Sequence, residues 1–179
     1  SKLRNIFSQL KLRPAQAVLI SFVTVIFLGT FLLMLPPSTV EGKNLSFMDA
    51  LFMATSATCV TGLGTLSLKT DFSLFGQLVI LILIQIGGLG IMTLSSSMAI
   101  LLGKSMGMKD RIIMQDLLDV SSLEDLFAVI VDIVRYTFLI ELWGGLVLTL
   151  AFTFEGFDFT KALYYGFFHS ISAFCNAGF

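Results

Sequence analysis

The sequence predicts an all-α polytopic membrane protein built from repeated units of a spanning helix, a short pore helix with its loop, and a second spanning helix. Three observations lead to this prediction. The chain of 179 residues is 56% hydrophobic and only 13% charged, whereas an ordinary soluble domain is about 25% charged. It contains three long apolar runs, and about 20 apolar residues suffice to cross a bilayer. One short phrase also occurs twice, which indicates an internal repeat.

The repeated phrase reads Ser-Ala-Thr-Cys-Val-Thr-Gly-Leu at 56–63 and Ser-Ala-Phe-Cys-Asn-Ala-Gly-Phe at 172–179. The two copies align without a gap, so that Ser, Ala, Cys and Gly coincide. In each copy a short amphipathic stretch leads into small and polar residues that end at a glycine. This pattern predicts a pore helix followed by a loop in both repeats.

The first predicted spanning helix runs from Pro14 to Leu35. Its roughly 22 residues carry no charge, and at ~1.5 Å per residue they can cross a hydrocarbon core of ~30 Å. Pro14 suits a first helical turn, and Pro36-Pro37 prevents the helix from continuing. The basic residues that precede this helix are Lys2, Arg4, Lys11 and Arg13.

The first short helix is expected to begin at a cap provided by Asn44 or Ser46 and to end near Ala57, with Asp49 in its first turn. The segment 58–67 that follows is rich in Thr, Ser and Gly. Non-helical backbone at membrane depth is tolerated only where it is buried in protein or lines a water-filled cavity. A re-entrant loop that lines a pore meets this condition.

The second predicted spanning helix covers Phe72 to about Leu102. This run is longer than one bilayer crossing, so the helix must tilt, project from the membrane or break. Gly87-Gly88-Leu89-Gly90 is the expected place for a bend or for a close helix contact. Gln85 lies one turn earlier and is expected to face protein or pore, because a strongly polar side chain is costly in lipid.

The segment 103–125 is polar and is predicted to form an amphipathic helix on the cytoplasmic membrane surface. Two alternatives remain open for it, a docking surface for a cytosolic partner and a plain connecting helix. The third spanning helix is predicted at Phe127–Phe154, with Asp132 and Arg135 forming an ion pair near its start. Thr160 is the candidate cap of the second short helix.

The predicted domain organisation is a first repeat at 1–102, the connector at 103–125 and the start of a second repeat at 126–179. Because no spanning helix follows the second glycine, we expect a fragment that is truncated within its second repeat. Basic residues before the first span and after the second favour the cytoplasmic side for both. The N-terminus is then cytoplasmic, and both loops enter from the outer face.

The two loops are suited to a desolvated monovalent cation, because backbone carbonyls offer dipoles without a fixed charge. Glycine tolerates the backbone angles that point successive carbonyls the same way, and Thr hydroxyls can add oxygens or brace the loop. The loops contain no Asp or Glu, which argues against a divalent-cation pore. The predicted ion filter consists of Thr58, Cys59, Val60, Thr61 and Gly62 in the first repeat and Phe174, Cys175, Asn176, Ala177 and Gly178 in the second.

Other polar residues receive more modest interpretations. The two cysteines occupy equivalent places in the repeats and are interpreted as small packing side chains, because a disulfide or metal site would need more ligands. His169 has no second metal ligand nearby and is interpreted as a packing or surface residue. Glu141 lies near the middle of the third span, where an ionised carboxylate is costly. Glu141 is either a functional residue, or it is neutral or hydrogen-bonded into a neighbouring helix. Gln85 and Glu141 are the two polar candidates inside the membrane.

Three segments resemble the Trk/Ktr/HKT superfamily of potassium transporters, most closely the bacterial Ktr membrane subunit. They are Ala-Thr-Ser-Ala-Thr-Cys-Val-Thr-Gly-Leu at 54–63, Gln-Ile-Gly-Gly-Leu-Gly-Ile-Met at 85–92, and the second copy of the repeated phrase at 172–179. The resemblance implies four repeats in one chain around a pseudo-fourfold pore. Gly62 and Gly178 are then the first two of four filter glycines.

The resemblance also implies a function and a set of partners. It implies potassium uptake across a bacterial plasma membrane, with K⁺ held only at the filter carbonyls and no covalent cofactor. It further implies a homodimer of the full-length chain, embedded in the lipid bilayer and gated by a cytosolic ring subunit that binds nucleotides. A net charge of −1 gives no general attraction to nucleic acid.

Two competing functions are considered. An ion-coupled secondary transporter with a site at the bilayer midplane would use Glu141 as its coupling carboxylate. A membrane enzyme is disfavoured, because the sequence has no His-Glu-x-x-His or Gly-x-Ser-x-Gly motif and no paired intramembrane aspartates.

Overall fold

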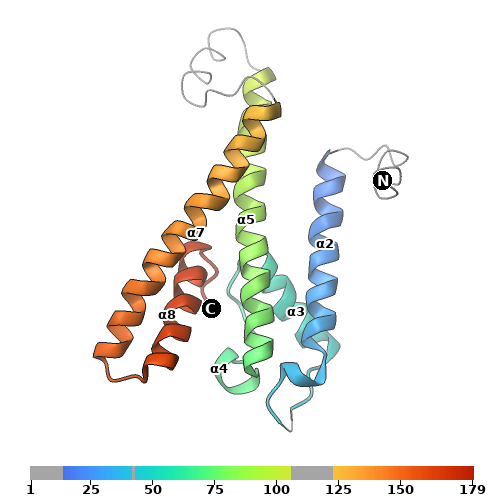
Figure 1. Ribbon diagram of the computed structural model, residues 1–179. Coiled ribbons are helices and arrows are strands. Elements are labelled where there is room, and N and C mark those ends of the chain that lie inside the picture. Colours follow the sequence, from blue (N-terminus) through green and yellow to red (C-terminus); the bar gives the residue numbers. More distant parts are fainter. Residues whose placement is uncertain (1–13, 42, 106–122) are drawn as a thin grey trace, which may run out of the picture. The chain divides into compact units, whose positions relative to one another are not determined.

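The computed structural model describes residues 14–41, 43–105 and 123–179. In these ranges the regular structure is helical, apart from one isolated antiparallel bridge between Thr39 and Phe72 (Figure 1). The helical elements are α2 (Pro14–Leu33), η1 (Pro36–Ser38), α3 (Phe47–Thr58), α4 (Leu68–Asp71), α5 (Leu74–Ser105), α7 (Leu123–Phe154) and α8 (Phe159–Phe174). The prediction of a helical protein is therefore confirmed.

The chain forms two compact units. Unit 1 comprises Ser1–Thr58 and Leu63–Leu83, and unit 2 comprises Cys59–Gly62 and Ile84–Phe179. The four-residue segment that follows α3 thus belongs to unit 2, together with the second half of α5, α7 and α8.

In unit 1, α2 ends at Leu33 and not at the predicted Leu35. Leu35 is already extended, with φ −67° and ψ 143°, because the ring of a following proline disfavours the helical conformation. The short helix α3 packs against α2. Its buried face consists largely of small side chains, which allow the two helices to approach closely.

Ser46, and not Asn44, caps α3. Its hydroxyl accepts a hydrogen bond from the Asp49 N–H at 3.1 Å and donates one to Asp49 Oδ2 at 2.6 Å. This reciprocal arrangement satisfies a free donor of the first turn and places a carboxylate where the helix dipole favours it. The helix then runs for 12 residues, too few to span a bilayer.

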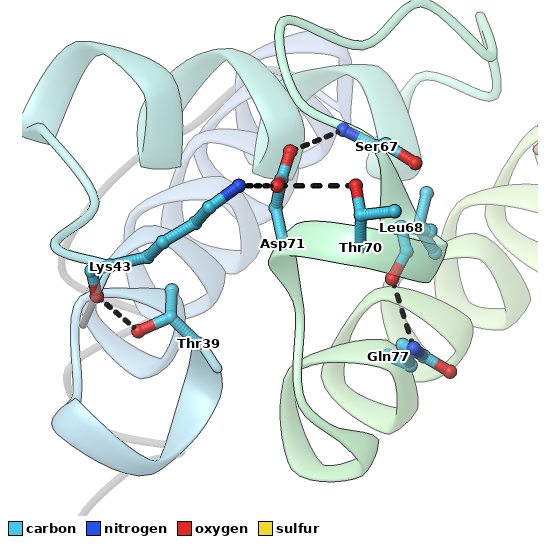
Figure 2. A network of polar contacts seen from close by, with 7 residues as sticks. All are labelled: Thr39, Lys43, Ser67, Leu68, Thr70, Asp71 and Gln77. Carbon is cyan, nitrogen blue, oxygen red and sulfur yellow. Dashed lines mark hydrogen bonds and ion pairs between the residues drawn. The ribbon is translucent and has the colours of Figure 1, made fainter. Parts of the chain in front are cut away.

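A polar network in unit 1 joins the segment after α2 to α4, and we name it the Lys43–Asp71 clasp (Figure 2). The Asp71 carboxylate accepts hydrogen bonds from Lys43 Nζ, from the Ser67 N–H at 2.9 Å and from the Thr70 hydroxyl at 3.2 Å. The Val40 N–H donates to the backbone oxygen of Asp71 at 3.1 Å. The clasp thereby ties together two chain segments that flank α3 and its loop.

In unit 2, α7 and α8 form a helical hairpin (Figure 1). Glycines allow the close approach, since a Cβ on Gly144 would lie 2.5 Å from Ser170 Oγ and one on Gly166 would lie 2.5 Å from Thr149 Oγ1. The predicted cap at Thr160 is wrong. α8 begins at Phe159, and the Asp158 carboxylate accepts from the Thr160 N–H at 3.2 Å.

The long helix α5 runs without interruption from Leu74 to Ser105. The prediction at its glycines left a bend or a close contact open, and the structure has the close contact. A Cβ on Gly88 would lie 2.5 Å from Cys175 Sγ. Gly88 therefore makes room for the side chain of Cys175.

Among the described residues, two helices are long and apolar enough to cross a membrane, at Leu74–Thr93 and Ala128–Phe154, and α2 contains a shorter apolar stretch at Leu19–Leu33. α7 begins before the predicted Phe127, at Leu123, and most of the predicted connector at 103–125 lies outside the described residues. Among the described residues, no ion pair joins Asp132 to Arg135, whose side chains are both exposed. Exposed ion pairs are weak, so helical spacing alone does not ensure their formation.

Candidate functional site

Two glycine loops form the candidate site: the first loop, Cys59–Gly62, and the second loop, residues 175–178. The first follows the last residue of α3 and the second follows the last residue of α8. In the first loop Val60 has φ 59° and Gly62 has φ 68°. In the second loop Asn176 has φ 58° and Gly178 has φ 78°. The left-handed conformation thus occurs at the same two positions of both copies of the repeated phrase.

The second loop begins with a helix-ending motif. The Asn176 N–H donates to Ala173 O at 3.0 Å, and the Ala177 N–H donates to Ser172 O at 2.8 Å. These two bonds, together with the left-handed φ of Asn176, make up the Schellman motif. Ser172 further holds Phe179, because its hydroxyl accepts from the Phe179 N–H at 3.2 Å. The loop is therefore attached to the C-terminal end of α8.

The two loops meet within unit 2. A Cβ added to Gly62 would overlap the carbonyl oxygen of Ala177, and one added to Gly178 would lie 3.9 Å from the Cα of Gly62. Gly62 thus combines a left-handed φ with a close approach of another backbone, and only glycine meets both conditions without strain. Two segments far apart in the sequence therefore come into backbone contact, with the carbonyl of Ala177 against Gly62.

A buried polar group lies beside the second loop. Glu141 of α7 is 3% exposed, and the Cys175 thiol donates a weak hydrogen bond to its Oε1 at 3.8 Å. The Ser170 hydroxyl donates to the backbone oxygen of Glu141 at 2.8 Å. Gln85 of α5 lies within reach of the same carboxyl group, although neither of its buried amide atoms has a hydrogen bond of ordinary geometry. The Glu141 carboxyl group therefore lies between Cys175 and the Gln85 side chain of α5.

The remaining predicted site residues differ in their surroundings. Thr58 is 1% exposed in unit 1, and its hydroxyl has no hydrogen-bond partner among the described residues. Cys59 and Thr61 are exposed, and Val60 and Phe174 are half-buried. Both cysteines are free thiols. His169 is exposed and its ring lies 5.9 Å from that of Phe152.

Sequence reasoning missed three residues that shape the site: Ser170, Ser172 and Gly88. Ser172 carried a signal, since it repeats Ser56 in the first copy of the phrase. Gly88 was noted only as part of a glycine cluster, and Ser170 had no signal. In the part of the chain that the structure describes, no group of three His, Cys, Asp or Glu side chains is arranged to hold a metal ion.

Comparison with known proteins supplies the family. The family model TrkH, described as a cation transport protein, matches residues 8–179. The chain belongs to the TrkH family. This membership confirms the resemblance to the Trk/Ktr/HKT superfamily that the three segments indicated, and the family is one of cation transport proteins, which is not a class of enzymes.

Several curated relatives have names that state a transported ion. Ktr system potassium uptake protein B of Bacillus subtilis (strain 168) is 40% identical over 98% of this chain and 39% of that protein. Potassium/sodium uptake protein NtpJ of Enterococcus hirae is 35% identical over 94% of this chain and 37% of that protein. Ktr system potassium uptake protein B of Vibrio alginolyticus is 37% identical over 90% of this chain and 35% of that protein. The TrkH-family chain thus spans less than two fifths of the length of these relatives.

Proposed function

We propose that this segment forms part of a potassium-uptake pore whose selectivity filter uses the backbone carbonyls of the two glycine loops. The observation that carries the proposal is the meeting of Gly62 with Ala177, in loops that share the same pair of left-handed positions. Such a convergence places a backbone carbonyl of the second loop against the first loop, and neither loop carries a fixed charge. Carbonyl oxygens can replace the hydration shell of a monovalent cation and still let it leave.

The helices that lead into the loops favour a cation as well. α3 and α8 both end where their loops begin, so the negative end of each helix dipole points toward its loop. α8 has 16 residues and α3 has 12, which makes both too short to span a bilayer. They are suited to be re-entrant pore helices.

Potassium is the proposed ion, because the named relatives are potassium uptake proteins. NtpJ is named for both potassium and sodium, so the preference between these two ions is the property to measure. We further propose a multi-pass protein of the bacterial plasma membrane with a cytoplasmic N-terminus. By resemblance, four repeats would complete the pore of each chain, two chains would pair, and a cytosolic nucleotide-binding ring would gate them.

The test is Rb⁺ or K⁺ flux into liposomes that hold the complete chain, with and without competing Na⁺, for wild type and Gly62→Ser. The serine side chain would collide with Ala177 and strain a left-handed φ, so we expect the preference for K⁺ over Na⁺ to fall about tenfold or more. Gly156→Ser is the matched control, since Gly156 also has a positive φ of 92° but has no neighbour within 4 Å. Retained selectivity in Gly62→Ser would show that the first loop is only a structural turn.

The alternative is an ion-coupled transporter that uses Glu141, and the burial of this carboxyl group is the observation that favours it. In that case uptake should depend steeply on pH, and Glu141→Gln should abolish the dependence. A flux that is insensitive to pH and is lost on substitution of Gly62 would favour the filter instead.

A further inference from the structure

The side chain of Cys175 is enclosed on two sides by parts of unit 2 that do not belong to its own loop. On one side, its thiol donates to Glu141 Oε1 of α7 at 3.8 Å. On the other side, α5 presents Gly88, where a Cβ would lie 2.5 Å from Cys175 Sγ. Cys175 is 6% exposed and Glu141 is 3% exposed, so the contact is closed to water, and the Gln85 side chain of α5 lies within reach of the same carboxyl group.

α7 is joined to α8 at a second point close to this contact. The Ser170 hydroxyl donates to the backbone oxygen of Glu141 at 2.8 Å, and Ser170 is itself 6% exposed. The α7 backbone at Glu141 is therefore held to α8 by a buried hydrogen bond five residues before Cys175. A carboxyl group so placed can transmit the position of α7 to the second loop.

The two loops differ in this respect. Cys59 has the same position in the first loop as Cys175 in the second, yet Cys59 is exposed and Cys175 is buried. The shared backbone conformation therefore does not require a buried thiol. The enclosure of Cys175 is a property of the second loop alone.

We propose that Glu141 is a positioning residue of the second loop, which it holds through the thiol of Cys175. Cys175 is the cap residue of α8, and its N–H donates to Ile171 O at 2.9 Å. The next residue, Asn176, has a left-handed φ of 58°, and Ala177 and Gly178 follow directly. A shift of Cys175 would therefore be passed to the Ala177 carbonyl, which meets Gly62, and to the other carbonyls of the second loop. This inference rests on the proposed function, because it assumes that those carbonyls select the ion.

The experiment compares K⁺ and Na⁺ competition for Rb⁺ flux in liposomes that hold the complete chain. Glu141→Leu keeps the size of the side chain but removes the acceptor, and it should lower the K⁺/Na⁺ preference by about tenfold. Glu141→Gln keeps an acceptor oxygen and should stay within about twofold of wild type. A residue that couples transport through its charge would instead be inactivated by the Gln substitution.

A double-mutant cycle identifies the route of the effect. If Glu141 acts through the thiol, the double variant Glu141→Leu/Cys175→Ala should have the same K⁺/Na⁺ preference as Glu141→Leu alone. The control is the double variant Glu141→Leu/Cys59→Ala, in which the fold-changes in K⁺/Na⁺ preference of the two single variants should multiply. If Glu141→Leu does not purify as a monodisperse protein, a comparison of Cys175→Ala with Cys59→Ala tests the same contact. The K⁺/Na⁺ preference is then expected to fall more in Cys175→Ala than in Cys59→Ala.

The possible outcomes separate the two proposals. A wild type without K⁺ preference overturns the proposed function and this inference with it. A selective wild type whose preference survives Glu141→Leu, or is lost equally in Glu141→Gln, overturns the inference alone. The inference is also overturned if the fold-changes in K⁺/Na⁺ preference caused by Glu141→Leu and Cys175→Ala multiply in the double variant.

Discussion

At the scale of single residues, the two loops place different side chains in one strained conformation. Val60 and Asn176 have φ values of 59° and 58°. Asn visits the left-handed region readily, because its short polar side chain can bond to nearby backbone, whereas a β-branched residue is a genuine outlier there. The first loop therefore holds Val60 in a conformation that its own side chain opposes.

This difference predicts opposite effects of exchanging the two residues. Val60→Asn should stabilise the protein by about 1 kcal/mol, and Asn176→Val should destabilise it by a similar amount. The measurement is the thermal unfolding midpoint of the purified chain in detergent. A lower midpoint for Val60→Asn would mean that packing of the valine side chain outweighs its backbone strain.

At the scale of elements, hydrogen bonds between connecting segments add to the contacts between helices in unit 1. α3 packs on α2 through small residues, while the Lys43–Asp71 clasp joins the segments that flank α3 and its loop (Figure 2). The hydrogen bond from Lys43, followed by that from the Ser67 N–H, holds the pKa of Asp71 below its usual range, although burial opposes this effect. The side chain of Lys43 is 52% exposed, so water and salt screen the pair.

The direction of this pKa shift predicts how the clasp responds to acid. Because the pKa of Asp71 is lower in the folded state, the clasp contributes its full stability above about pH 3.9, the ordinary pKa of an aspartate. That contribution is lost as the pH falls through the lower pKa of the folded state. Asp71→Asn should therefore lower the unfolding midpoint at neutral pH and reduce its dependence on acid pH.

Asp132→Asn provides the control for this prediction, since Asp132 is exposed and forms no ion pair among the described residues. It should leave the midpoint at neutral pH nearly unchanged. Equal effects of the two substitutions would show that overall charge, and not the clasp, is responsible.

At the scale of the whole molecule, the two glycine loops would provide only part of the ion filter that we propose. Selectivity for K⁺ requires that enough oxygens surround the ion to replace its hydration shell. Gly62 and Gly178 contribute two loops, whereas the resemblance implies four. The chain spans less than two fifths of its relatives, in agreement with a filter to which further segments contribute.

We therefore expect residues 1–179, reconstituted alone in liposomes, to show no flux that prefers K⁺ over Na⁺. The complete chain should show such a flux under the same conditions. A selective flux from the segment alone would require that copies of it assemble into a filter, and chemical cross-linking of the reconstituted segment would then detect oligomers.

The sequence by itself determined the helical class, the family, and the bounds of α2, α3, α5 and α7 to within a few residues, whereas the short helices η1 and α4 were not predicted. Apolar runs, prolines and small-residue loops act over a few neighbouring positions, so their consequences can be read along the chain. Caps were less certain, because Ser46 and Asn44, or Asp158 and Thr160, have similar capping ability. Which of them bonds the first turn depends on where the chain enters the helix.

Only the tertiary structure decided how the second loop is surrounded. The repeated phrase makes Cys59 and Cys175 equivalent, yet one is exposed and the other lies against Glu141 and Gly88. The contact of Gly62 with Ala177 likewise joins residues far apart in the sequence. Such pairings depend on how whole helices pack, and no local pattern encodes which side chains will then meet.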